Sequence, residues 1–263
     1  MLAASILNSA GTLVFRDLSA PEDRLLSGNM MTVIESTRVS RLKTVAIALV
    51  ALLFVKVLLT ILYEYRLYFP ANFDAAFLSG RRDTFVGLYR VAFYAHIVSG
   101  PSAIMLVVFL MITGGRVFYR NTHRWAGRAL SLIVLFVVAP SGLLMAYQSH
   151  AGPVAASGFA TLALGSAICI TAAVSRARSR QFQSHQQWAI RGFILLCSPL
   201  LSRLVAGALI VLQLESDWSY RLNAWLSWLV PLAIYEVWRL VSAGTDLIPF
   251  PSYRSRPRES VYP

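Results

Sequence analysis

Residues 91–113 read VAFYAHIVSGPSAIMLVVFLMIT, an apolar run of 23 residues without Asp, Glu, Lys or Arg. A helix needs about 20 apolar residues to cross the hydrocarbon core of a bilayer. Because lipid offers the backbone no hydrogen-bond partners, each such run is expected to be helical. The sequence therefore predicts an all-α fold, a polytopic bundle of six transmembrane helices at Thr44–Tyr63, Val91–Thr113, Ala129–Tyr147, Val154–Val174, Phe193–Gln213 and Asn223–Val241.

Composition places the whole chain in the membrane class. Of its 263 residues, 57% are apolar and only 14% are charged, whereas soluble domains carry about a quarter charged residues. The net charge is +12, which on a soluble domain would suggest nucleic acid. Here the arginines lie in loops between apolar runs, so the positive-inside rule accounts for them and no nucleic-acid partner is expected. The expected partner is the lipid bilayer.

The basic residues also predict an orientation. With the N-terminus inside, 17 Lys and Arg residues fall on the cytoplasmic side and five on the opposite side. Basic residues concentrate in cytoplasmic loops. The bias predicts that both chain ends are cytoplasmic, in a multi-pass protein of the bacterial inner membrane.

Three regions are expected along the chain. Residues 1–43 form a cytoplasmic N-terminal segment without order, residues 44–241 the six-helix transmembrane domain, and residues 242–263 a disordered cytoplasmic tail. Met30 or Met31 is an alternative to Met1 as the translation start. The loop of residues 64–90, on the outer side, is expected to include a short interfacial helix near Asn72–Leu78.

Ionisable side chains inside spans are costly and are therefore functional hypotheses. Three are intramembrane polar residues here: Lys56, Arg203 and Glu236. The long stem of Lys56 allows its amine to snorkel to the headgroups. Arg203 and Glu236 lie on neighbouring antiparallel helices, so a contact between them is expected even though their depths differ by about two helical turns. Such a pair either fixes helix packing or takes part in moving a substrate or proton.

The four histidines are candidate cofactor ligands. His96 and His150 lie on the outer side at the second and fourth spans; His123 opens the third span and His185 precedes the fifth, both on the inner side. Histidine ligates haem iron, copper and zinc, and facing helices can supply a ligand each. The alternative is structural: His96 packs between helices, His150 sits in an exposed turn, and the inner pair belongs to a wet surface.

In that alternative, Thr122 and Ser184 are expected to act as helix N-caps beside the inner histidines. No other motif in the sequence identifies catalytic or metal-binding residues. The sequence contains no phosphate-binding glycine loop, no CxxC and no HExxH. Whether the protein is an enzyme stays open.

Three stretches carry a resemblance to a known family. They are YAHIVSG at 94–100, HRWAGR at 123–128 and SHQQWAIR at 184–191. With Arg203 and Glu236, these stretches resemble a family of predicted bacterial membrane proteins of unknown function, over about residues 44–241. The arrangement of helices and histidines is also similar to that of the six-helix cytochrome b561 proteins, which hold haem between helices two and four and between helices three and five. That resemblance implies haem b as a cofactor.

Three functions are compatible with these observations. The first is an integral membrane protein with a polar intramembrane core, such as a small transporter, channel or assembly factor. The second is a b-type haem protein that carries electrons across the membrane. The third is a membrane scaffold whose buried charges only set helix packing.

Overall fold

The computed structural model describes the backbone of residues 6–7, 13–14, 21–75, 77–149 and 152–244, and side chains within 41–242. The chain divides into two compact units, Met1–Lys56 and Val57–Pro263. The first unit holds the short antiparallel strands β1 (Ile6–Leu7) and β2 (Leu13–Val14), with Ile6 opposite Val14. It also holds most of α1 (Pro21–Glu64).

The described part of α1 presents an apolar surface. Arg41–Leu67, which includes the short helix η1 (Tyr65–Leu67), is long and apolar enough to cross a membrane. Its Leu and Val side chains stay exposed, for example Leu49 and Leu52. A helix with exposed apolar side chains all round is stable in lipid and not in water. α1 begins at Pro21, within the segment of residues 1–43. The disorder expected for that segment stays a prediction. The tail of residues 242–263, which is also expected to be disordered, lies mostly outside the described residues.

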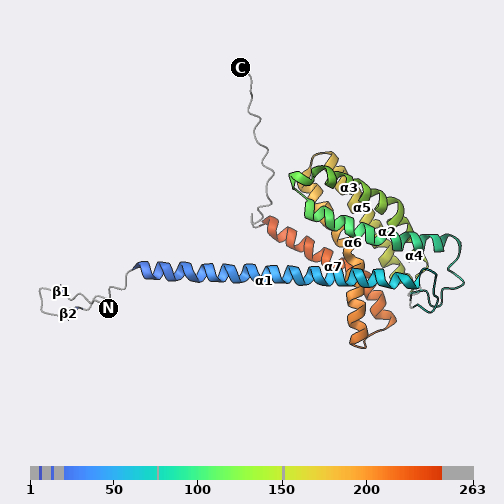
Figure 1. Ribbon diagram of the computed structural model, residues 1–263, viewed down its shortest axis with the longest axis horizontal. Helices are drawn as coiled ribbons and strands as arrows, with labels where there is room; N and C mark the ends of the chain where they lie inside the picture. Colours follow the sequence, from blue (N-terminus) through green and yellow to red (C-terminus); the bar gives the residue numbers. More distant parts are fainter. Residues whose placement is uncertain (1–5, 8–12, 15–20, 76, 150–151, 245–263) are drawn as a thin grey trace, which may run out of the picture. The chain divides into compact units, whose positions relative to one another are not determined.

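The second unit is a helix bundle (Figure 1). Its third span is a continuous helix made of four successive segments, η2, α3, η3 and α4, of which η3 is π-helical. This span is followed by three long helices. In chain order the elements are α2 (Gly87–Thr113), η2 (Val117–Tyr119), α3 (Arg120–Ile133), η3 (Val134–Val138), α4 (Ala139–Tyr147), α5 (Pro153–Arg178), α6 (Phe182–Val211) and α7 (Asp217–Gly244).

The π segment has a local cause in Pro140. Proline lacks an N–H, and in a regular α-helix its ring would clash with the carbonyl four residues earlier. The wider turn of η3 ends directly before it, and the Ala139 amide donates to the Val134 carbonyl five residues back. The side chains of α4 therefore point in directions that differ from those expected if α3 continued as a regular α-helix.

Successive spans run antiparallel, so the bundle has two ends. End A is where α2 and α5 begin and α6 ends, at Gly87, Pro153 and Val211. End B is where α2 ends and α6 begins, at Thr113 and Phe182. α5 packs against α4, α6 and α7 and is central to the bundle.

Five helical segments of the described chain meet the length and hydropathy expected of a membrane span. They include the first five spans that the sequence predicts. The sixth, Asn223–Val241, lies within α7, whose tryptophans, Tyr235, Glu236 and Arg239 lower its hydropathy. The helix is present, but its membrane crossing remains a prediction.

Several apolar clusters hold the bundle together, and two of them lie near the candidate site and the loop of residues 65–86. The central one joins α2, α3, η3, α5 and α6 through Ala103, Val107, Leu130, Val134, Ile170 and Leu196. The second lies at end A, where Tyr68, Leu78 and Phe85 of the loop of residues 65–86 pack on Phe93 of α2. This loop is therefore a fixed cap on end A.

The cap differs from the expected short helix near Asn72–Leu78. Described residues there form successive turns instead. The Asn72 side chain accepts a hydrogen bond from the Asp74 amide at 2.9 Å. Such a side-chain turn competes with helical hydrogen bonding and favours a loop.

Candidate functional site

His96 is held between α2 and α4. Its Nδ1 lies 3.0 Å from the Ser141 hydroxyl oxygen. That hydroxyl donates its single proton to the Val137 carbonyl at 2.5 Å, so it accepts from the imidazole. This arrangement favours a proton on Nδ1 of His96 and a lone pair on Nε2. Gly142 keeps α4 close: a Cβ added there would lie 3.3 Å from His96 Cε1.

His123 has the same arrangement at end B. Its Nδ1 lies 3.2 Å from the Thr113 hydroxyl oxygen. The Thr113 hydroxyl donates to the Phe109 carbonyl at 2.8 Å, which again favours the imidazole as the donor at Nδ1. Thr113 is buried, at 3% exposure, which shields this bond from water.

His185 repeats the pattern with a backbone acceptor. Its Nδ1 lies 2.8 Å from the Ala173 carbonyl of α5, which can only accept. His185 and His123, on α6 and α3, are near enough for their charges to interact. At all three described histidines the contact at Nδ1 favours a proton there, which gives one of the two tautomers that metal-ligating histidines adopt.

The expected histidine positions need two corrections. His123 lies within α3 and His185 within α6, because both helices begin before the apolar runs that mark the spans. The N-caps are Tyr119 and Gln181, neither with a side-chain cap bond, so the expectation for Thr122 and Ser184 was wrong. His150, the fourth candidate, lies outside the described residues.

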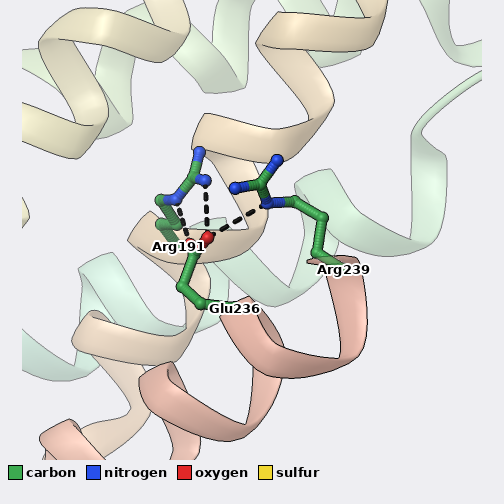
Figure 2. A network of polar contacts seen from close by, with 3 residues as sticks. All are labelled: Arg191, Glu236 and Arg239. Atoms are coloured by element: carbon green, nitrogen blue, oxygen red, sulfur yellow. Dashed lines mark hydrogen bonds and ion pairs between the residues drawn. The ribbon is translucent and has the colours of Figure 1, made fainter. Parts of the chain in front are cut away.

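Glu236 of α7 is the centre of a charged network near end B (Figure 2). Its Oε1 lies 2.5 Å from Arg191 Nε and its Oε2 3.0 Å from Arg191 Nη2, a two-point contact. Arg239 Nε also reaches Oε2, at 3.0 Å. The Arg191 guanidinium lies over the Trp188 ring, 4.7 Å from its centroid. The network joins α6 to α7 and carries a net charge of +1.

The expected contact between Arg203 and Glu236 was therefore wrong. Arg203 is twelve residues beyond Arg191 on α6, about 18 Å along the helix, and lies nearer end A. There its Nη1 pairs with Glu64 at 3.1 Å, with side chains 49% and 37% exposed. Lys56 lies exposed on α1, and the snorkelling expected for it stays a prediction.

Arg81 is a polar residue whose role the sequence does not reveal. It lies in the cap on end A with 8% exposure, although its neighbour Arg82 is exposed. Its Nη1 donates to the Tyr89 hydroxyl at 2.7 Å and to the Gln148 carbonyl at 3.1 Å. Nothing in the sequence distinguishes Arg81 from Arg82, because burial here depends on the turns of the cap.

Within the described residues, no group of three or more His, Cys, Asp and Glu side chains could hold a metal ion. A site formed by the described residues would therefore use fewer protein ligands. Two imidazoles can suffice for haem, whose porphyrin supplies the other four ligands of the iron.

The helices that carry these residues match a family model. The family is described as predicted membrane protein DUF2306, and the match covers residues 93–239. This chain belongs to the DUF2306 family. No curated protein and no solved structure matches the chain. The DUF2306 region runs from α2 to α7 and includes His96, His123, His185 and the network around Glu236. The protein is thus a membrane protein of a family without an assigned activity.

Proposed function

We propose that this membrane protein transfers electrons and holds b-type haem through histidine Nε2 atoms. The observation that carries the proposal is that His96, His123 and His185 each place Nδ1 within hydrogen-bond distance of an oxygen atom. Such a bond orients the ring and raises the basicity of the opposite nitrogen.

His123 and His185 form the pair best suited to hold the group. They come from α3 and α6, interact electrostatically, and each is anchored to another helix, at Thr113 of α2 and Ala173 of α5. Ligands on facing helices are the usual arrangement for cofactors in helix bundles. A bound b-type haem would supply a one-electron iron couple. The chain would hold both imidazoles neutral and oriented.

The test is the visible spectrum of the purified protein. Expressed with added haem precursor, the wild-type protein should give the absorbance bands of a reduced bis-imidazole haem and at least one iron per chain. His123→Ala and His185→Ala should each remove the bands from this site. Gln186→Ala, an exposed neighbour on the same helix, is the matched control. A colourless wild-type protein without iron contradicts the proposal.

A second function, transport, is favoured by Glu236. An acidic side chain between two arginines on membrane helices is a common feature of substrate and ion pathways. If the protein moves a substrate, Glu236→Gln should stop flux into liposomes while the bundle stays folded. Wild-type flux in this variant would leave Glu236 with a packing role, as in a scaffold.

We also propose six crossings, with α7 as the last, and both ends of the chain in the cytoplasm of a bacterial cell. The support is the arginine-rich end B, to which Arg120, Arg124, Arg176 and Arg178 contribute. Basic loops stay on the cytoplasmic side. A cysteine-reactive, membrane-impermeant label should reach a cysteine placed at end A in intact cells, and one at the C-terminal end only after lysis. The reverse pattern would overturn this topology.

A further inference from the structure

Arg81 presents a charged group in a setting where no carboxylate of the described residues balances it. Its side chain is 8% exposed, and no ion pair between Arg81 and a described carboxylate is formed. A buried, unbalanced charge costs several kcal/mol unless it is compensated, as order-of-magnitude arguments show. The faces of Phe77 and Tyr89 lie 4.8 Å and 5.9 Å from the guanidinium carbon and offset part of this.

The hydrogen bonds of Arg81 use only one side of its guanidinium. Nη1 makes both, to the Tyr89 hydroxyl and to the Gln148 carbonyl. Nε is buried and has no hydrogen-bond partner. A buried N–H without a partner costs about 1–3 kcal/mol. The edge formed by Nε and Nη2 therefore has an unfilled donor.

Arg191 shows what this edge binds in the same protein. It uses Nε and Nη2 together to grip the two carboxylate oxygens of Glu236. This planar, two-point geometry suits carboxylate and phosphate groups. At Arg81 the equivalent edge is present and the oxyanion is missing from the described chain.

We propose that Arg81 is the centre of an oxyanion-binding site at end A. The ligand is a molecule outside the chain that offers a carboxylate or phosphate group to Nε and Nη2. Two sources share this chemistry, a phospholipid headgroup and a small soluble anion. The site does not depend on whether the protein binds haem.

Nε is covered by protein in this structure, so an oxyanion reaches it only when the side chains around it shift. Gln148, whose carbonyl accepts from Nη1, and Tyr220 in the first turn of α7 are both exposed at end A. Tyr220 is near enough to Arg81 for their charges to interact. The cap therefore fixes a cation beside an accessible turn.

The experiment compares the wild-type protein with Arg81→Gln and with the matched control Arg82→Gln. Arg82 is adjacent, exposed and also lies over an aromatic ring, that of Phe73. In detergent, inorganic phosphate is titrated against chloride at constant ionic strength while the thermal unfolding midpoint is measured. In parallel, native mass spectrometry records whether phosphatidylglycerol stays bound to protein taken from nanodiscs.

A soluble ligand raises the midpoint by about 2–4 °C in wild type and Arg82→Gln but not in Arg81→Gln. A lipid ligand instead leaves a retained phosphatidylglycerol in the first two proteins and none in Arg81→Gln. Either result supports the site and names its source. Equal behaviour of all three proteins overturns the proposal.

A failure of Arg81→Gln to fold does not remove the test. Arg81→Lys keeps the positive charge but lacks the two-point edge, so it should bind phosphate or lipid at least tenfold more weakly than wild type. The wild-type protein alone also decides. If it shows neither a phosphate-dependent midpoint nor a retained anionic lipid, Arg81 only fastens the cap to Tyr89 and the proposal is wrong.

Discussion

Replacing Glu236 with Gln removes the negative charge of the network in Figure 2, so that its net charge rises from +1 to +2, while the size of the side chain is kept. Glu236 pairs with Arg191 and Arg239, whose side chains are 15% and 30% exposed. Breaking a fully buried pair costs about 3–5 kcal/mol, and breaking an exposed pair costs under about 1 kcal/mol. The partial exposure here places the expected loss at about 2 kcal/mol, because two arginines are then left facing each other.

The assay is unfolding of the purified protein by SDS in mixed micelles. A double-mutant cycle with Arg191→Gln should give a coupling energy of about 1–2 kcal/mol. Either single substitution already breaks the two-point contact, so the double variant should lose less stability than the sum of the two single variants. Glu215→Gln is the control, because Glu215 is exposed in the turn before α7. The reasoning is refuted if Glu236→Gln is as stable as this control and the coupling is near zero.

Two further outcomes are expected. Gly158→Ala should lower the free energy of unfolding by about 1–3 kcal/mol in the same assay, because the added Cβ would lie 3.0 Å from the Trp225 ring. The control is Gly207→Ala, which should be neutral or slightly stabilising because nothing lies within 4 Å of the added Cβ. Equal losses in the two variants would contradict the packing argument. Thr113→Val removes the hydroxyl that orients His123, so it should weaken haem retention by about tenfold. The measurement is the haem absorbance that remains after dialysis. Unchanged retention would count against the role of this hydroxyl.

The spans could be predicted from the sequence because a bilayer imposes length and hydropathy directly. The helix ends could not, since hydropathy records the thickness of the hydrocarbon and a helix continues into the polar interface. α3 begins at Arg120, nine residues before the apolar run that starts at Ala129. This difference places His123 inside a helix, where its imidazole reaches Thr113.

The partners of the polar residues were only partly predictable. Sequence neighbours suggested Arg203 for Glu236, but pairing requires equal depth, and Arg191 is the arginine of α6 at that level. The partner of Arg203 is Glu64, at the end of α1. Contacts between distant elements depend on packing that a single sequence does not encode locally. The oxygen atoms that contact Nδ1 of each histidine could not be predicted from the sequence for the same reason.

The π-helical turn at Val134–Val138 divides the third span into two halves that face their neighbours independently. Each residue of an α-helix advances the face by about 100°, so one residue more or fewer swings everything beyond it around the axis. Deleting Leu135 would leave His123 in place and carry Ser141 away from His96. At this wide turn, the insertion or deletion of a single residue would therefore change the hydrogen bond of His96 to Ser141 and leave that of His123 to Thr113 intact.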